Sequence, residues 1–267
     1  MQKKKLGLAL GSGAWRGLVH IGVLKSLEEN KIKIDYIAGS SVGAIIGGLY
    51  SYFGKVSEVE KIVKSLKFSD MIKVLWDKPL HRGEGVISGE KYDSFFRNIV
   101  GNVRIEELKI PFVAVCADLK KGELVRLKKG DLVKAMRASS AIPVVFKPVK
   151  RAGRTLVDGG AITPVPVEPC RQMGAEIVAG VSLYGGVFPV QRDRKPMTRF
   201  EMAKVSRFLP LKTLADHDLE KADVVVEPKI EGEDYGLFAN FVKNKQVIDS
   251  GKMAMDEKIS ELKQLLG

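Results

Sequence analysis

The sequence predicts an α/β fold, in which a mostly parallel central sheet is sandwiched by helices. Two apolar runs, Leu6–Leu10 and Tyr36–Ala38, each lead into a turn of small residues and then into a helical pattern. Strand, glycine turn and helix thus occur twice in succession, which is typical of parallel α/β proteins. A chain of 267 residues can bury a large core, and no stretch resembles a linker. We therefore expect one domain over residues 1–267, with a motif-bearing core at about 6–185 and a helical C-terminal part at about 200–267.

The first half of the chain supplies the two repeated units. The first strand enters a helix at about Ala14, whose apolar face extends to near Asn30. The second strand is followed by a Gly-Ser-Ser-Val-Gly turn and a helix from Val42 to about Phe53. From Val56 to about Val100 the apolar residues recur mostly at helical spacing, so we expect mainly helix there.

The second half is predicted to contain shorter elements. Strands at Phe112–Ala117 and Glu123–Leu127 are separated by Lys-Lys-Gly, which indicates a hairpin. The remaining expectations are a helix at Asp131–Ala138, a strand at Thr155–Val157, a helix at Val165–Met173, strands at Ile177–Ser182 and Val224–Val226, a surface loop from Gly185 to Thr198 and an amphipathic helix from about Asn244 to Leu266.

The chain is strongly basic. Its 44 Lys and Arg residues against 32 acidic ones give a net charge of +12, which suits an anionic partner. There is no zinc-finger spacing and no Arg-rich or aromatic run typical of RNA binding, so an anionic membrane surface is a better partner than a nucleic acid. Solvated loops remain the alternative interpretation. The basic clusters are Lys3–Lys5, Lys120–Lys129, Lys147–Arg154 and Arg192–Lys195.

Targeting signals and cysteine sites are not expected. The apolar part of the N-terminus, Leu6–Leu10, is too short for a signal peptide, and the uncharged stretch from Tyr36 to Gly54 is too rich in Gly and Ser for a membrane span. The two cysteines, Cys116 and Cys170, stand far apart and form neither a CxxC motif nor a metal-ligand spacing. We expect a soluble cytoplasmic protein that needs no metal or other cofactor.

The first motif with chemical meaning is Gly39-Ser40-Ser41-Val42-Gly43. It fits the G-x-S-x-G frame, in which a tight strand-to-helix turn exposes the central serine at a helix N-terminus. Ser41 is therefore the candidate nucleophile. Ser40 is out of frame and is the second choice.

A nucleophilic serine needs a base, and the histidines do not supply an obvious one. His20, His81 and His217 do not follow a carboxylate in the Ser…Asp…His order of the α/β-hydrolases. The carboxylate candidate is Asp158, which ends an apolar run and precedes two glycines. Strand ends of parallel sheets gather functional groups, although a simple Asp-Gly turn is the alternative interpretation.

The third motif is the glycine-rich segment Gly11–Gly17, which can serve two purposes. Acyl transfer needs backbone N–H donors near the developing oxyanion, and glycines let the backbone approach closely. A dinucleotide-binding turn has a similar composition, but it requires an acidic residue at the end of the second strand. Here Asp35 precedes that strand, which counts against an NAD(P) site.

In their order, these motifs resemble those of the patatin-like phospholipases. The resemblance spans about Leu6 to Val167 and includes Ala138–Pro143, which is similar to a block in bacterial members. It implies an α/β sandwich that hydrolyses fatty acyl esters by a Ser–Asp dyad without histidine. By position, Ser41 is the nucleophile and Asp158 the base, while Gly11, Ser12 and Gly13 supply the oxyanion hole with support from Arg16. Ser12 and Trp15 depart from the pattern, where Gly and a small residue are common.

The expected function is therefore hydrolysis of fatty acyl esters of phospholipids or lysophospholipids through an acyl-enzyme. We expect a shielded pocket to raise the pKa of Asp158, since a carboxylate is otherwise a weak base at neutral pH. The alternatives are a catalytically idle lipid-binding or regulatory protein of the same fold and, less favoured, an NAD(P)-binding protein. The charge predicts reversible, peripheral attachment to anionic membranes.

Overall fold

The computed structural model describes residues 3–65, 87–185, 198–206, 208–230 and 244–267. Three sequence-based expectations therefore lie wholly or mostly outside the described residues: the middle of the helical segment at 56–100, the loop at 185–198 and the surroundings of His81. The basic cluster Arg192–Lys195 lies outside them as well.

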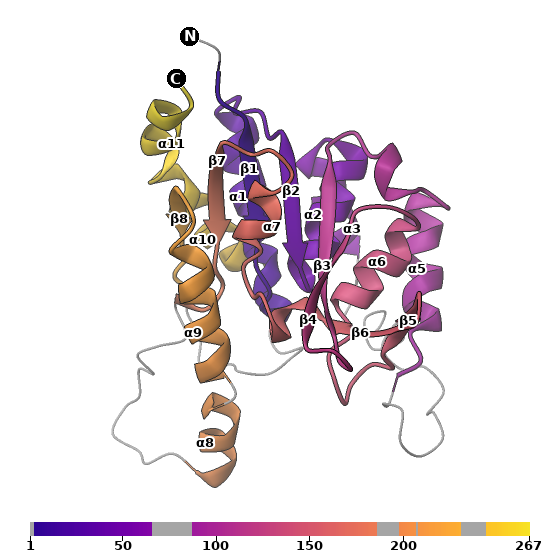
Figure 1. The fold of residues 1–267 in the computed structure, drawn as a ribbon. Helices are drawn as coiled ribbons and strands as arrows, with labels where there is room; N and C mark the ends of the chain where they lie inside the picture. Colours follow the sequence, from indigo (N-terminus) through magenta and orange to yellow (C-terminus); the bar gives the residue numbers. More distant parts are fainter. Residues whose placement is uncertain (1–2, 66–86, 186–197, 207, 231–243) are drawn as a thin grey trace.

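A single mixed sheet organises the described chain (Figure 1). Its strand order is β5-β6-β3-β2-β1-β7-β8, and β4 also pairs with β3. Neighbours from β3 to β8 are parallel, whereas β4, β5 and β6 pair antiparallel. The strands are β1 (Leu6–Leu10), β2 (Tyr36–Ser40), β3 (Phe112–Asp118), β4 (Glu123–Leu127), β5 (Val149–Arg151), β6 (Arg154–Asp158), β7 (Ile177–Val181) and β8 (Val224–Val226).

Helices cover both faces of this sheet, which confirms the predicted α/β class. In Figure 1, α7 and α9 lie in front of the strands and α1, α2 and α3 behind them. The helices are α1 (Val19–Glu29), α2 (Val42–Phe53), α3 (Val56–Ser65), α5 (Glu90–Val100), α6 (Leu132–Ser139), α7 (Val167–Arg171), α8 (Arg199–Ser206), α9 (Phe208–Leu219), α10 (Asn244–Asp256) and α11 (Ile259–Leu266), and short 3₁₀ turns occupy Ala14–Leu18, Ile105–Glu107 and Gly159–Ala161.

The alternation of side chains along β1 separates the two layers. Leu6, Leu8 and Leu10 are fully buried in the larger core cluster with α1 and α2, while Ala9 faces the smaller cluster under α7 and α9. Both faces of the central strands are therefore covered, which explains why these strands are continuous apolar runs in the sequence.

The C-terminal part differs from the single helix that was expected. The chain turns after Asp256, and α11 brings Ile259, Leu262 and Leu266 into the main core. No Gly or Pro marks this bend, so an amphipathic pattern could not reveal it. The short strand β5 was also not predicted. None of the described helices is long and apolar enough to cross a membrane.

Candidate active site

Ser41 occupies the strained turn between β2 and α2. Its backbone has φ 55° and ψ −121°, a conformation that is unusual for a residue other than glycine. Such a strained conformation persists only where the surrounding structure stabilises it. A Cβ atom at Gly39 would lie 2.5 Å from the Gly43 carbonyl oxygen, and one at Gly43 would lie 2.1 Å from the Leu10 oxygen. Both glycines are therefore required by close backbone approach, and the turn presents Ser41 at the N-terminus of α2.

The structure brings Ser41 and Asp158 into direct contact. The Ser41 hydroxyl donates to Asp158 Oδ2 at 2.6 Å, and both residues are buried. The other carboxylate oxygen, Oδ1, accepts the Gly160 amide at 2.7 Å. The Asp158 backbone is itself fixed, because its N–H donates to the Ala141 carbonyl at 3.0 Å. A nucleophile within hydrogen-bond reach of an oriented base is the geometry that covalent catalysis requires.

Asp158 reaches this position by a different route from the one expected. It does end a strand, but β6 runs antiparallel to β3 and pairs Asp158 with Cys116. On the other side of β3, Val115 pairs with Ser40 of β2. The carboxylate therefore comes from the antiparallel strand β6, which is separated by β3 from the strand that leads to Ser41.

Burial sets the protonation of Asp158. Removal from water raises its pKa to about 6, while the hydrogen bonds from Ser41 and Gly160 act in the opposite direction. The direction agrees with the expectation of a shielded pocket. At neutral pH the carboxylate is ionised and can accept a proton from Ser41.

Two further hydroxyl groups hold the site, and sequence reasoning assigned neither a role. Ser139 Oγ accepts the Ser41 amide at 3.0 Å and donates to the Val115 carbonyl at 2.6 Å. The Tyr184 and Ser12 hydroxyls lie 2.8 Å apart. Ser139 belongs to the block that resembles bacterial patatin-like proteins, and Tyr184 follows β7 at the carboxyl edge of the sheet. The family block and the strand end are therefore the sequence features that could have indicated Ser139 and Tyr184.

Two of the three amides expected in the oxyanion hole already donate elsewhere. The Gly11 N–H donates to the Val181 carbonyl at 3.0 Å, and the Ser12 N–H to the Pro164 carbonyl at 2.8 Å. Within the described chain, the Gly13 N–H has no recorded hydrogen bond. The loop therefore offers one of its three predicted amides to a ligand. Gly11 and Ser12 instead hold the loop against its neighbours.

Arg16 is buried beside the same loop. Its guanidinium carbon lies 5.7 Å from the ring centre of Trp15 and 5.2 Å from that of Phe208, distances at which cation–π attraction operates. The bulky Trp15, which departs from the family pattern, thus packs against the arginine. Phe208 begins α9, so the C-terminal part of the chain contributes to the site.

The described histidines do not contact Asp158. His20 is fully buried, and its Nε2 lies 2.8 Å from the Gly11 carbonyl oxygen, so this nitrogen carries the proton. Burial lowers the His20 pKa to about 4, and the residue is neutral at pH 7. His217 is exposed and lies 3.3 Å from Glu220. His81 lies outside the described residues, and Ser40 is buried with no hydrogen-bond partner for its hydroxyl among the residues described.

Asp35 lies at the wrong end of β2 for a dinucleotide site. Its carboxylate accepts the Leu6 amide at 2.9 Å and the Lys33 ammonium at 2.6 Å, where β1 and β2 begin. A ribose-binding acid must instead stand where the second strand ends, at the carboxyl edge. The described residues also contain no group of three or more His, Cys, Asp or Glu able to hold a metal ion.

The dyad opens into an apolar cleft of about 350 Å³. Its polar lining residues are Ser12, Arg16, Ser41, Asp158 and Tyr184. Its walls contain mainly apolar residues: Gly13, Ala14, Ile142, Pro143, Gly160, Ala161, Phe208, Pro210, Leu211 and Leu214. A cleft with a few polar groups and mainly apolar walls suits an acyl chain attached to an ester.

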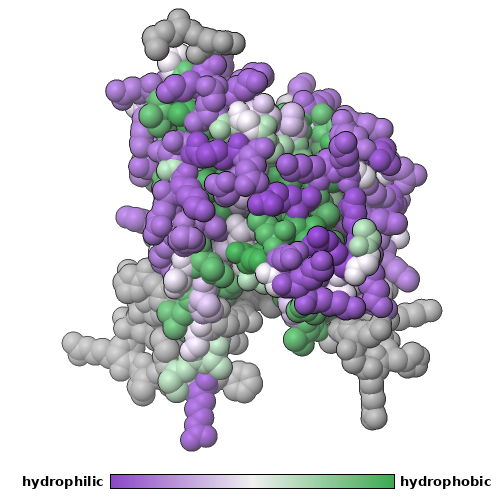
Figure 2. Space-filling view, viewed as in Figure 1, coloured by the Kyte–Doolittle hydropathy of each residue, from purple (hydrophilic) through white to green (hydrophobic). Residues whose placement is uncertain are grey.

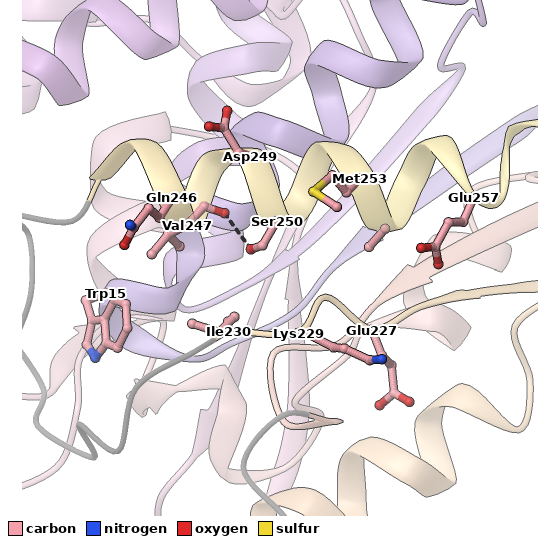
Figure 3. Close-up of a pocket in the computed structure, with 11 residues that line it drawn as sticks. Trp15, Glu227, Lys229, Ile230, Gln246, Val247, Asp249, Ser250, Met253 and Glu257 are labelled. Atoms are coloured by element: carbon pink, nitrogen blue, oxygen red, sulfur yellow. Dashed lines mark hydrogen bonds between the residues drawn. The ribbon is translucent and has the colours of Figure 1, made fainter.

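A larger cavity of about 480 Å³ lies between α10, the segment after β8 and Trp15 (Figure 3). It contains one serine, Ser250, whose hydroxyl donates to the Val247 carbonyl at 2.8 Å within the same helix. Among the described residues, this serine has no carboxylate partner, so the cavity lacks a serine–carboxylate pair like that of the smaller cleft.

Comparison with known proteins gives consistent matches. The family model of patatin-like phospholipases matches residues 8–171. An uncharacterized NTE family protein of Mycobacterium tuberculosis is 41% identical over 192 residues, covering 72% of this chain and 52% of that protein. Lysophospholipase NTE1 of Coccidioides immitis is 31% identical over 183 residues, covering 67% of this chain and 12% of that protein. The chain thus spans about half the length of the mycobacterial relative.

A solved structure shares the fold. VipD from Legionella pneumophila aligns with a TM-score of 0.53 at 13% identity, covering 98% of this chain and 67% of that one.

Proposed function

Because the chain belongs to the patatin-like phospholipase family, we propose that it is a serine acyl hydrolase that cleaves fatty acyl esters of phospholipids or lysophospholipids. The observation that carries the proposal is the 2.6 Å hydrogen bond from the Ser41 hydroxyl to buried Asp158. The resemblance of this chain to a lysophospholipase supports the substrate class.

The proposed reaction has two steps. Asp158 accepts the hydroxyl proton as Ser41 Oγ attacks the ester carbonyl, and the same carboxyl then returns that proton to the departing alcohol. The product is a fatty acyl ester of Ser41. In the second step Asp158 takes a proton from water, the resulting hydroxide attacks the acyl-enzyme, and the proton returns to Ser41 Oγ as the fatty acid leaves.

The oxyanion of each step needs donors near Ser41. The Gly13 amide and the N-terminus of α2 are the groups we propose for it, because both lie at the cleft and are oriented by backbone contacts. Arg16 supports the loop electrostatically from its place between Trp15 and Phe208. The Gly11 and Ser12 amides act indirectly, by fixing the loop that carries Gly13.

The net charge and the cysteines bear on where in the cell the protein acts. We propose one domain that acts in the cytoplasm and attaches reversibly to anionic membranes. The net charge of +12 supports the attachment, and the two free, buried cysteines suit a reducing compartment. The pairing of β8 with β7 and the packing of α10 on α1 support a single folding unit.

The test is fatty acid release from a lysophospholipid, together with labelling by a fluorophosphonate probe, in buffer containing a chelator. We expect release and labelling in the same preparation, with undiminished rates in the presence of the chelator. A stable, folded protein that neither releases fatty acid nor reacts with the probe would identify it as the idle lipid-binding alternative.

The pKa of Asp158 predicts the acidic limb of the pH profile. The base must be ionised, so kcat/KM should rise about tenfold per pH unit below pH 6 and level off above it. The profile is measured with a water-soluble short-chain ester, so that membrane binding does not interfere. A profile that still rises steeply between pH 7 and 8 would contradict Asp158 as the base.

Ser139→Ala is expected to weaken both stability and activity. It removes the acceptor of the Ser41 amide and the donor to Val115, leaving two buried backbone groups without partners, at a cost of about 1–3 kcal/mol. We expect a lower Tm and a roughly tenfold lower kcat, because the strained turn loses its support. Ser140→Ala is the matched control, since the Ser140 hydroxyl accepts no amide of the turn and donates within its own helix to Met136. Equal effects of the two substitutions would contradict a positioning role for Ser139.

A further inference from the structure

Large apolar side chains are exposed at few places in the described chain, and two of these places adjoin the catalytic cleft. Among the described residues, the large apolar side chains that are exposed are Leu119, Val144, Met202, Leu209 and Met253. Two of them, Val144 and Leu209, directly adjoin residues that line the cleft, and Met202 lies on α8, which contacts α9. Figure 2 shows apolar side chains reaching the surface in the lower half of the molecule, along α9 and beside the strands, while the upper half is mostly hydrophilic.

Val144 and Leu209 each lie next to residues that line the cleft. Val144 directly follows Ile142–Pro143, which line it, and Leu209 stands between the lining residues Phe208 and Pro210. Neither Val144 nor Leu209 lines the cleft itself. Val144 is 83% exposed and Leu209 is 51% exposed, so each of these two segments carries an apolar group that reaches solvent.

Leu119 and Met202 extend this surface. Leu119 follows β3 at the edge where Cys116 pairs with Asp158, and its neighbours Lys120 and Lys121 are exposed with no ion pair recorded among the described residues. Met202 lies on α8, which contacts α9. In Figure 1, β2 and β7 point toward the end of the molecule where α8 and the start of α9 lie.

Val144 combines two unfavourable features. A β-branched residue at φ 72° is a backbone outlier, and its side chain gains nothing from burial because it is 83% exposed. Strain of this kind persists where function requires the arrangement. An apolar side chain pushed outward beside a lipid-sized cleft is well placed to enter the apolar part of a membrane.

We propose that Leu119, Val144, Met202 and Leu209 form a docking rim, which inserts into the surface of an anionic bilayer and places the cleft over its lipids. The inference rests on the proposed function, because a lipid ester must pass from the bilayer to Ser41. The charge of the chain supports the choice of partner: +12 overall, with Lys120 and Lys121 beside Leu119. The docking rim supplies the apolar contribution to membrane binding, and the lysines supply the electrostatic contribution.

The test uses Val144→Asn with Leu209→Gln in the full chain, and Met253→Gln as the matched control. Met253 is 65% exposed, but it lies on α10 and lines the other cavity. Binding is measured by co-sedimentation with phosphatidylcholine vesicles, with and without phosphatidylserine, at low and high salt. We expect the wild type to prefer the anionic vesicles and to retain part of its binding at high salt. The double variant should bind at least about tenfold more weakly, and the control within about twofold of wild type.

Two further measurements separate docking from catalysis and folding. Turnover of a water-soluble short-chain ester should be the same in the double variant and the wild type, since neither side chain lines the cleft. Val144→Asn alone should not lower Tm, because Asn tolerates a positive φ better than Val. Wild-type binding by the double variant, an equal loss in Met253→Gln, or no vesicle binding by the wild type would each overturn the docking rim. Absent ester turnover in the wild type, with the expected vesicle binding, would overturn the proposed hydrolase and leave the docking rim standing.

Discussion

Ser41→Ala is expected to abolish fluorophosphonate labelling and to lower fatty acid release by roughly four to six orders of magnitude. The substitution removes the hydroxyl that donates to Asp158 and leaves the turn otherwise intact, since Gly39 and Gly43 still permit the close backbone contacts. Labelling is read by mapping the modified peptide, and release is measured with a lysophospholipid substrate. An unchanged Tm shows that the loss is chemical rather than structural.

Ser40→Ala is the matched control for this experiment. Ser40 is adjacent in sequence and fully buried, but its hydroxyl has no hydrogen-bond partner among the described residues. Its removal should therefore preserve labelling and turnover and leave stability unchanged or slightly higher. A label mapped to Ser40, or full turnover in Ser41→Ala, contradicts the assignment of Ser41.

The structural setting of Ser41, the proposed nucleophile, was predictable because it is local in the sequence. An apolar strand, five residues of the G-x-S-x-G frame and a helix follow one another directly, and the strand ends and the helix begins next to Ser41 as expected. The alternation of strands and helices likewise predicted the α/β class. Both predictions depend on short-range periodicity and on glycines that backbone contacts require.

Features that depend on distant partners were not predictable. The segment Gly11–Gly13 was predicted to offer three free amides. Two of them instead donate to the carbonyls of Val181 and Pro164, which are more than 150 residues away in the chain. The antiparallel direction of β6 depends on its pairing with β3 rather than on its own sequence. Ser139 and Tyr184 contact the site through side-chain hydrogen bonds to residues far away in the chain, which no local sequence pattern predicts.

Asp158→Asn is expected to reduce hydrolysis by about 10²–10⁴-fold while keeping the fold. The amide oxygen can still accept the Gly160 N–H, and the NH2 group that replaces Oδ2 can donate to the Ser41 oxygen, so the packing persists, but the amide cannot take the Ser41 proton. The raised pKa adds a stability prediction. Because the folded carboxyl binds its proton more tightly than the unfolded one, its ionisation destabilises the fold progressively between about pH 4 and pH 6. At pH 7 the neutral Asn should therefore leave Tm unchanged or raise it.

The histidines provide the decisive comparison for this base assignment. His20→Gln, His81→Gln and His217→Gln should each retain substantial activity. His20 contacts the Gly11 carbonyl, so its substitution affects activity only through the position of the glycine loop. His217 is exposed. Activity is measured with a water-soluble ester at pH 7, alongside Tm for each variant, so that loss of fold is separated from loss of catalysis. If a folded histidine variant is as inactive as Asp158→Asn, the reaction depends on that histidine. A dyad of Ser41 and Asp158 alone would then no longer explain catalysis.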